Sequence, residues 1–424
     1  MLDRSVRMSQ NQSTNSVIHA RCCIAGGGPA GMMLGYLLAR AGIETVVLEK
    51  HADFLRDFRG DTIHPSTLEV MHELGLLEEF LQRPHDQMRQ VDGQVGDERL
   101  TMADFTHLPT RCKFIAFMPQ WDFLDFLAGK GRSYSKFHLH MQSEVTALLQ
   151  NNERITGVRV QTPQGELEIH ADLVIGADGR SSIVREQAQL QVLNIGAPID
   201  VLWMRISRQE GDPPQTLGRI DNGHIMVMLN RGDYWQCAYV IQKGGIDAIK
   251  ASGLDAFRKE IAGLAPYLSE RISELKTWDD IKLLTVTVDR LQQWHRPGLL
   301  CIGDAAHAMS PIGGVGINLA IQDAVATANV LTPAFLRGTP TQKDLAAVQE
   351  RRTFPTRATQ WMQVQIQNRV ISRVLASAQR PTLPWQLKLL RAWPFLRRVP
   401  ARFVGMGFRP EHVSKLLREA RGGD

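Results

Sequence analysis

Residues 24–31, Ile24-Ala25-Gly26-Gly27-Gly28-Pro29-Ala30-Gly31, decide the fold of this chain. An apolar run over residues 17–25 predicts a buried strand that ends at this glycine turn, and apolar residues at helical spacing over residues 32–38 predict a helix after it. Residues 45–48 are an apolar, β-branched run typical of a parallel strand, and Glu49 follows them directly. The order strand, G-x-G-x-x-G turn, helix, strand and acid predicts a Rossmann-like domain that binds a dinucleotide.

Each part of this motif has a physical task. Gly26 and Gly28 allow the backbone to turn tightly and approach a pyrophosphate, and Gly31 allows close packing of helix and strand. The helix start at residues 29–30 offers free N–H groups and a partial positive charge to phosphates. The carboxylate of Glu49 can accept the hydroxyl groups of an adenosine ribose. A glycine turn can also serve packing alone, but the full context favours the dinucleotide.

Composition excludes several classes of protein. A chain of 424 residues with 43% hydrophobic and 22% charged residues is too long for one ordinary domain and is not disordered. The five cysteines have no metal-ligand spacing, so we expect no disulfide framework and no metal site. The first 20 residues are polar and the next apolar stretch is broken by glycines, which predicts a cytoplasmic protein. Charge is uneven, because residues 351–424 hold 15 Lys and Arg against 3 Asp and Glu.

Two further motifs follow predicted strands. Residues 172–185 contain Asp178-Gly179, and Gly303-Asp304-Ala305-Ala306-His307 precedes the glycine-rich residues 311–318. Alone, each could be a strand that ends in a turn, with the aspartate as a helix cap. His307 is best interpreted as a packed or capping histidine that shapes this turn. All three motifs in this order indicate one shared site.

With these motifs, Arg59-Gly60 and the helix predicted over residues 65–76, the chain resembles the single-component FAD-dependent aromatic hydroxylases of the para-hydroxybenzoate hydroxylase fold, over residues 17–331. The resemblance implies bound FAD and a transient co-substrate, NADPH or NADH, because no second G-x-G-x-x-G is present. It implies a monooxygenase that inserts one atom of O₂, through a flavin C4a-hydroperoxide, into an apolar and aromatic or polyketide-like small molecule.

The resemblance also implies roles for individual residues. Arg59 and Gln120 would contact FAD, Asp178-Gly179 would support both FAD and the pyridine nucleotide, and Asp304 would bind the ribityl chain. The flavin-facing loop would include Pro311, Gly314 and Gly316, with no side chain assigned to catalysis. The implied FAD-binding residues are Gly26, Gly28, Pro29, Ala30, Gly31, Glu49, Lys50, Arg59, Gln120, Asp178, Gly179, Asp304, Gly316, Ile317 and Asn318.

A helix is predicted after Gly316, and its N-terminus would favour the negative charge that collects on the flavin N1/O2 edge during reduction. The resemblance implies that backbone N–H groups of Gly316, Ile317 and Asn318 face the pyrimidine oxygens, and the helix start is consistent with that placement.

The predicted fold class is α/β, with a Rossmann-like FAD-binding domain, an inserted and mostly antiparallel substrate sheet, and a C-terminal helical segment. His224, Arg205 and Tyr239 lie in the sheet region at spacings that would suit one face, but no role is assigned to them. The predicted domains are a discontinuous FAD-binding domain over residues 17–75, 100–190 and 285–340, a substrate domain over 76–99 and 191–284, and a basic helical region over 341–424.

Alternatives remain at this point. A flavin halogenase is disfavoured because no Trp-x-Trp-x-Ile-Pro is present, whereas an FAD-dependent reductase of isoprenoid-type chains and a non-catalytic, membrane-associated flavoprotein stay open. The basic, apolar residues 385–409 could contact an anionic membrane. A solvated helical cap on the FAD domain is favoured instead, because Pro394 and Pro400 break any long helix. No nucleic-acid partner is expected, and the sequence does not indicate an oligomeric state.

Overall fold

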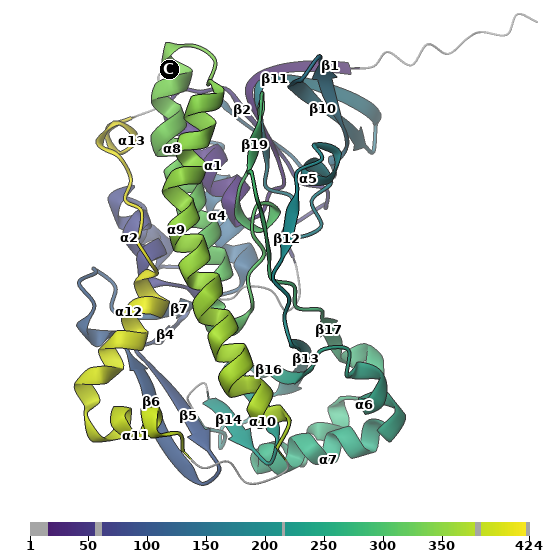
Figure 1. Cartoon of the computed structure of the whole chain (residues 1–424), viewed down its shortest axis with the longest axis vertical. Helices are drawn as coiled ribbons and strands as arrows, with labels where there is room; N and C mark the ends of the chain where they lie inside the picture. Colours follow the sequence, from purple (N-terminus) through teal and green to yellow (C-terminus); the bar gives the residue numbers. More distant parts are fainter. Residues whose placement is uncertain (1–15, 56–61, 214–216, 378–382, 421–424) are drawn as a thin grey trace, which may run out of the picture.

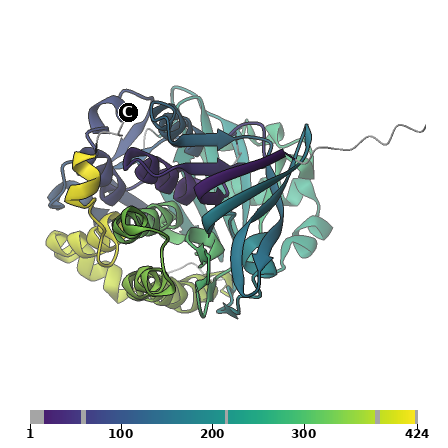
Figure 2. The same cartoon turned by 90° about the horizontal axis from the view of Figure 1, so that it is seen from above.

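The computed structural model describes residues 16–55, 62–213, 217–377 and 383–420. Two large sheets lie at opposite ends of the long axis, and two long helices, α8 (Gly316–Arg337) and α9 (Gln342–Ile366), run between them (Figure 1). Seen from above, α8 and α9 stand side by side (Figure 2). This arrangement confirms the predicted α/β class with a second, mostly antiparallel sheet.

The first sheet has eight strands in the order β19-β20-β11-β1-β2-β8, with β10 and β9 continuing from β11. Its centre, from β20 to β8, is parallel, and β9, β10 and β19 pair antiparallel. Parallel strands are covered on both faces, which explains why residues 22–25 are buried without alternation. Its strands are β1 (Ser16–Ala25), β2 (Thr45–Leu48), β8 (Phe137–His140), β9 (Glu144–Asn151), β10 (Arg154–Thr162), β11 (Gly165–Gly176), β19 (His295–Arg296) and β20 (Leu299–Cys301).

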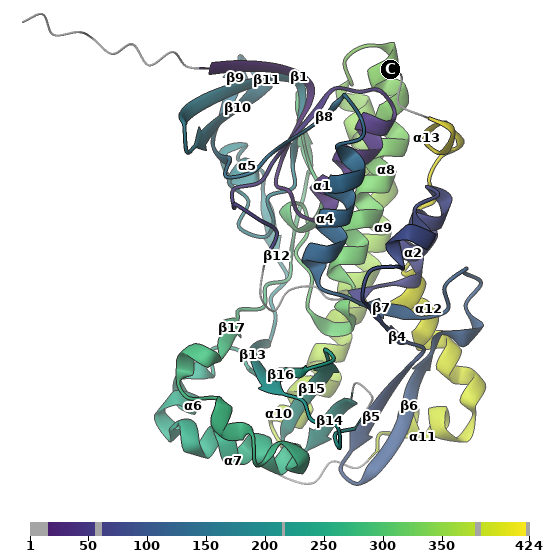
Figure 3. The same cartoon turned by 180° about the vertical axis from the view of Figure 1, so that it is seen from behind.

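Helix α1 (Pro29–Arg40) packs against both α4 (Gln120–Gly131) and α8 beside this sheet (Figure 3). Helix α8 is long and apolar enough to cross a membrane, but 78% of its most apolar window is buried inside the protein, as in a core helix. The aromatic cluster of residues 114–126 is also core, since Phe123 and Phe126 are buried. All five cysteines are free and buried, as expected.

The second sheet has seven strands in the order β17-β13-β16-β15-β14-β5-β6, and only the β14–β5 pair is parallel. Its strands are β5 (Gln90–Val95), β6 (Glu98–Asp104), β13 (Ile199–Ser207), β14 (Leu217–Asp221), β15 (His224–Asn230), β16 (Tyr234–Gln242) and β17 (Lys282–Leu284). Helices α6 (Ile246–Ser252) and α7 (Leu254–Leu264) follow it, and Phe257 and Ile261 of α7 pack on one face.

The grouping of His224, Arg205 and Tyr239 on one face is wrong. Tyr239 lies opposite Leu202 and packs against Phe257 of α7, with His224 Nδ1 2.5 Å from its hydroxyl. Arg205 lies three residues beyond Leu202 on β13, so its side chain points to the opposite face. Spacing along single strands could not reveal this, because the faces depend on the register between β13 and β16.

The remaining elements are short or lie in the C-terminal part. Small sheets join β3 (Thr62–Ile63), β7 (Ile115–Phe117) and β4 (Asp86–Met88), and β12 (Val192–Asn194) with β18 (Asp289–Leu291). The other helices are α2 (Pro65–Glu73), α3 (Leu77–Phe80), α5 (Ile183–Gln187), α10 (Ser372–Leu375), α11 (Trp385–Ala392), α12 (Arg398–Met406) and α13 (Lys415–Glu419). Single turns are η1 (Phe105–His107), η2 (Pro266–Leu268), η3 (Ile272–Glu274), η4 (Trp278–Asp280), η5 (Gly303–Ala305), η6 (Ile312–Gly314) and η8 (Pro394–Arg397), and η7 (Gln367–Ile371) is a π-helix.

A fully buried carboxylate, Asp323 of α8, joins the core helices to the loop after β20. It accepts hydrogen bonds from the backbone N–H of Gly303 (3.0 Å) and from Arg352 Nε of α9 (2.7 Å), and His307 Nε2 lies 2.5 Å away. Arg352 Nη1 also lies 3.5 Å from Glu411 in the C-terminal segment. Burial would raise the pKa of Asp323, but His307 and Arg352 outweigh it and lower the pKa.

Three buried glutamines of the α9–η7 segment bind the continuation of the same loop. Gln360 Nε2 donates to the carbonyl of Ala308 (3.2 Å), and Gln363 Nε2 donates to the carbonyl of Ser310 (2.9 Å). Gln367 Nε2, in the π-helix, donates to Ser310 Oγ (2.6 Å). The loop is therefore fixed by directional hydrogen bonds as well as by packing.

The C-terminal segment is tied to the start of α2 through His64. Its ring is fully buried, and Nδ1 lies 2.7 Å from the carbonyl of Val404 in α12. Burial lowers the pKa of His64 to about 4, although the hydrogen bond to Val404 opposes the shift.

Replacing Asp323 by asparagine keeps the volume and removes the charge that compensates Arg352. We expect the free energy of unfolding in urea to fall by about 3–5 kcal/mol, because a buried guanidinium loses its closest anion. The control Glu419→Gln breaks the exposed Lys415–Glu419 pair and should cost less than about 0.5 kcal/mol. A loss of less than about 1 kcal/mol in Asp323→Asn would contradict this role.

His64 predicts a specific pH dependence of stability. Its folded pKa of about 4 lies below its unfolded value, so the unfolded chain binds more protons and stability is lost as pH falls from about 6.5 towards 4. The amide of His64→Asn can still donate to Val404 but does not titrate. When pH falls from 7.5 to 5, the free energy of unfolding in urea should therefore drop by about 2 kcal/mol less in this variant than in the parent. The control His107→Asn, at a half-exposed position, should follow the parent profile. Parallel profiles for parent and His64→Asn would refute the assignment.

Candidate cofactor and active site

The three sequence motifs converge at one edge of the first sheet. Strands β20, β11, β1 and β2 are adjacent and parallel, so their carboxyl ends lie at the same edge. The chain leaves these ends at residues 302–307, 177–180, 26–31 and 49–50. In open parallel sheets, ligands bind in the crevice outside the carboxyl ends of the strands.

Packing requires two of the three motif glycines of the first turn, Gly26 and Gly31, but not the third, Gly28. Gly26 has φ +108°, and a Cβ there would lie 2.3 Å from the carbonyl oxygen of Ala177. A Cβ on Gly31 would lie 1.9 Å from the carbonyl oxygen of Gly26, so both positions are dictated by packing. Gly28 precedes α1, and a Cβ there would meet no atom within 4 Å. The turn therefore leaves open space beside Gly28, where the backbone can approach a pyrophosphate.

Glu49 lies against this turn. Its Oε2 accepts the backbone N–H of Gly27 (3.2 Å), and its Oε1 accepts the backbone N–H of His51 (3.1 Å). Its side chain is mostly buried, so the carboxylate is held in place beside the glycines. Lys50, the next residue, is exposed. This placement of Glu49 suits a ribose acceptor.

Asp178 is the structural centre of the second motif. Its carboxylate accepts the hydroxyl of Ser182 (2.5 Å) and the backbone N–H of Val184 (3.1 Å), which organises the start of α5. Burial raises the pKa of Asp178, and these hydrogen bonds oppose the rise. Gly179 follows with φ +85°. The side chain of Asp178 therefore shapes the turn, as a capping residue does.

The second and third motifs meet through an ion pair. Arg180 Nη2 lies 3.4 Å from Asp304 Oδ2, and both side chains keep about a third of their surface exposed. The first and third motifs also touch, because a Cβ on Gly303 would lie 3.1 Å from the Cβ of Ala30. Asp304 and the glycine turn thus line one continuous surface.

The loop after the third motif leads into α8. Gly313 (φ +78°) and Gly314 (φ +62°) require the left-handed region, and a Cβ on Gly314 would lie 2.5 Å from Thr62 Oγ1. Pro311, Gly314, Gly316 and Ile317 are half-buried, so the loop keeps an accessible face. Helix α8 has no side-chain cap and no acidic residue in its first turn, which leaves its first N–H groups available to an anionic partner.

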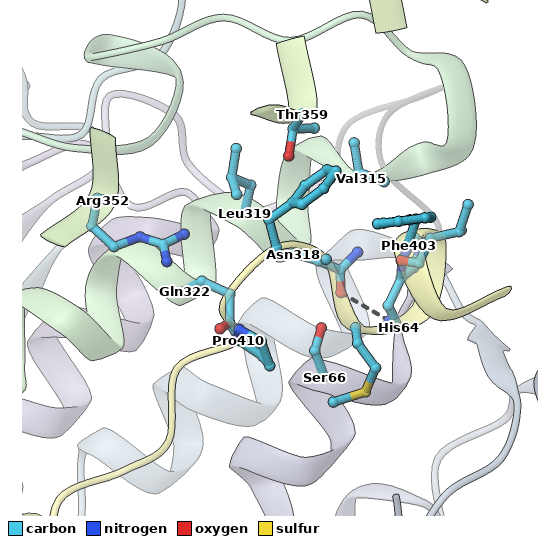
Figure 4. A pocket seen from close by; sticks show the side chains of 14 residues that line it. His64, Ser66, Val315, Asn318, Leu319, Gln322, Arg352, Thr359, Phe403 and Pro410 are labelled. Carbon is cyan, nitrogen blue, oxygen red and sulfur yellow. Dashed lines mark hydrogen bonds between the residues drawn. The ribbon is translucent and has the colours of Figure 1, made fainter. Parts of the chain in front are cut away.

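The side chain of Asn318 is fully engaged within the protein. Its Oδ1 accepts the N–H of His64 and the hydroxyl of Thr67, both at 2.8 Å, and its Nδ2 donates to the carbonyl of Thr62 (3.0 Å). A cofactor contact from Asn318 would therefore use its backbone. The same residue borders a cavity that α12 also lines, with Phe403 near Asn318 and His64 (Figure 4).

Two other residues predicted to contact FAD are not among the converging turns that the structure describes. Gln120 is the half-buried first residue of α4, away from the converging turns in sequence. Arg59 lies outside the described residues. Sequence reasoning missed Arg180 and Asp323, although an isolated aspartate in the apolar stripe of α8 was a usable signal. It also missed the three glutamines, whose spacing of three and four residues places them on one helix face.

Comparisons with known proteins agree with this geometry. Residues 19–362 match the family described as FAD binding domain. The 6-methylpretetramide 4-monooxygenase of Streptomyces rimosus is 30% identical over 369 residues, which cover 86% of this chain and 87% of that protein. The 12-dehydrotetracycline 5-monooxygenase/anhydrotetracycline 6-monooxygenase of Streptomyces rimosus subsp. rimosus is 29% identical over 319 residues, covering 71% of this chain and 60% of that protein.

Among solved structures, PqsL of Pseudomonas aeruginosa, described as a probable FAD-dependent monooxygenase, superimposes with a TM-score of 0.70. It covers 84% of this chain and 98% of its own, at 21% identity, and so shows the fold alone. The family match spans most of the chain and all three motifs, which confirms the resemblance seen in the sequence. The chain therefore belongs to the FAD binding domain family, as an FAD-dependent monooxygenase.

Proposed function

We propose that this monooxygenase takes reducing equivalents from NADPH or NADH and inserts one atom of O₂ into an apolar, aromatic or polyketide-like small molecule. The observation that carries the proposal is the convergence of Gly28, Glu49, Asp304 and the uncapped start of α8 at one edge of the sheet. These groups offer a place for pyrophosphate, ribose, ribityl chain and flavin in that order. FAD, when bound, accepts a hydride from the nicotinamide and activates O₂.

The roles of this chain's own residues follow from their chemistry. Glu49 would hold the adenosine ribose, and the first N–H groups of α1 would bind the pyrophosphate. Backbone N–H groups of Gly316, Ile317 and Asn318 would face the pyrimidine oxygens, where negative charge collects on reduction. Fixing the loop through Asp323 and the glutamines keeps these donors pre-oriented.

The apolar contacts between the loop before α8 and the second sheet support an apolar substrate. Ile312 packs against a cluster on the second sheet that includes Val201, Ala238 and Val240. The face of the second sheet nearest the loop is therefore largely apolar, and exclusion of water there would protect a reactive oxygen donor. The two relatives named for pretetramide and tetracycline compounds favour a fused-ring substrate of this kind.

The decisive experiment measures NADPH or NADH consumption, O₂ uptake and hydrogen peroxide together, with a panel of fused-ring aromatic compounds. One compound should stimulate NAD(P)H consumption by at least about tenfold, with matching O₂ uptake and little peroxide, because a seated substrate captures the oxygen before water does.

Stimulated consumption without O₂ uptake would instead identify a reductase, such as one acting on isoprenoid-type chains. FAD reduction without multiple turnover for every compound would identify a non-catalytic flavoprotein. Either result would overturn the monooxygenase proposal.

The glycine turn allows a test that separates cofactor binding from folding. Gly28→Ala should leave the stability of the FAD-free protein within about 0.5 kcal/mol, because the new Cβ meets no atom and φ is −73°. The same Cβ occupies the space offered to the pyrophosphate, so FAD affinity measured by fluorescence titration should fall at least about tenfold.

Two control variants separate a specific loss of FAD affinity from a general effect of adding a Cβ. Gly129→Ala, on α4, also meets no atom within 4 Å and should leave FAD affinity unchanged. Gly31→Ala should destabilise the FAD-free protein itself, because its Cβ would overlap the carbonyl oxygen of Gly26. Unchanged FAD affinity in Gly28→Ala would place the pyrophosphate elsewhere.

A further inference from the structure

The exposed aromatic side chains of the described residues gather in one part of the chain. Large hydrophobic residues are exposed at scattered positions, but in the part of the chain that the structure describes the exposed Phe and Trp residues all lie between residues 354 and 403. Trp361, Trp385 and Phe395 each expose 60% or more of their surface. The set comprises Phe354, Trp361, Trp385, Trp393, Phe395 and Phe403. Exposed apolar side chains mark an interaction site where they form a contiguous patch, so their contacts with one another decide the interpretation.

The same part of the chain has no negative charge. Residues 351–410 contain 12 Lys and Arg and no Asp or Glu, whereas residues 1–350 contain 34 Lys and Arg against 41 Asp and Glu. Most of these cations are exposed, including Arg357, Lys388, Arg402 and Arg409. Of the cations in this stretch, Arg391 of α11 is already paired with Glu98 of β6. The stretch is still strongly positive while the rest of the chain is negative, so an anionic plane would attract this part of the chain and repel the rest.

Ring contacts show that part of this surface is continuous across two helices. Phe354 of α9 lies 6.4 Å from Phe408, and Phe408 lies 5.0 Å from Phe403 of α12, centroid to centroid. The guanidinium of Arg409 lies 4.4 Å above the Phe354 ring. Trp361, two turns beyond Phe354, extends the same side of α9. Figure 1 shows α12 beside α9, and α11 below α12 next to β6.

We propose that this aromatic–arginine face, defined by the exposed aromatic and basic residues of α9, α11, η8 and α12, docks the protein on an anionic lipid bilayer. Phe and Trp side chains enter the boundary between headgroups and acyl chains, and the arginines pair with lipid phosphates and carboxylates. The short helices, separated by Pro394 and Pro400, lie along the surface and do not cross it. The docking is independent of the proposed reaction.

A lipid surface fits these residues better than an acidic protein or a second copy of the chain. Tryptophan together with arginine is enriched where apolar and charged layers meet in a bilayer. A second copy would bring a like-charged face against this one, and the lack of acidic residues over 60 positions leaves the arginines without partners across such a contact.

The test is co-sedimentation of the full-length FAD-loaded protein with vesicles. Vesicles of phosphatidylcholine with about a third phosphatidylserine should bind it, vesicles of phosphatidylcholine alone should bind at least about tenfold more weakly, and about 0.5 M salt should remove most of the difference. Equal binding to both vesicle types, or no binding to either, would overturn the proposal.

Two pairs of variants separate the charge from the aromatic contribution. Arg357→Glu/Arg402→Glu and Trp361→Ser/Phe395→Ser should each weaken binding to anionic vesicles at least about tenfold. The matched controls Lys250→Glu/Lys259→Glu, on α6 and α7, and Leu283→Ser/Leu336→Ser, at other exposed apolar positions, should change it less than about twofold. Circular dichroism and FAD content should stay at parent values in all four.

Three further outcomes would refute lipid docking. One is a loss of vesicle binding in the control variants equal to that in the test variants. Another is a dimer in sedimentation velocity that Trp361→Ser/Phe395→Ser dissociates, which would assign the face to self-association. The third is binding of soluble polyglutamate as tight as that of vesicles and insensitive to the aromatic pair, which would assign it to an acidic protein.

Discussion

The buried carboxylate of Asp323 couples four segments that are far apart in sequence. It binds the loop after β20 through Gly303 and His307, and it binds α9 through Arg352, which reaches Glu411 in the C-terminal segment. A charge buried this deeply is tolerated only when its partners are all in place. The position of the loop beside the proposed flavin site therefore depends on the correct seating of α9 and of the chain's last helices.

This coupling explains why α9 buries a polar face. Helix α9 buries arginine, threonine and glutamine side chains, where a helix between two sheets would ordinarily bury leucine and valine. Apolar packing would hold α9 without fixing its rotation closely. The hydrogen bonds from the Gln363 amide to the carbonyl of Ser310, and from the Gln367 amide to the hydroxyl of Ser310, specify distance and direction. The loop over residues 308–312, proposed to lead to the flavin, thus takes its shape from a segment that follows it by about fifty residues.

The parts predicted from sequence are those in which partners are close in the chain. The β1–α1–β2 unit, the glycine turn and the position of Glu49 beside Gly27 follow from about thirty consecutive residues. The faces of Arg205 and Tyr239 were misassigned because strand register decides them. The roles of Asp323 and of the glutamines could not be deduced, because the partners in these bonds lie 16 to 57 residues away, across packing that no local pattern encodes.

Gly28 and Gly31 show how far a motif can be interpreted without its ligand. Both are glycines of one turn, but Gly31 is required by the fold, since any side chain would overlap the backbone of Gly26. Neither the backbone angles nor the neighbours of Gly28 require glycine there. The folded chain alone gives no reason for a missing side chain at this position, which lies beside the first N–H groups of α1. The proposed dinucleotide phosphate would explain the missing side chain, because a Cβ on Gly28 would occupy the space where the phosphate approaches those N–H groups.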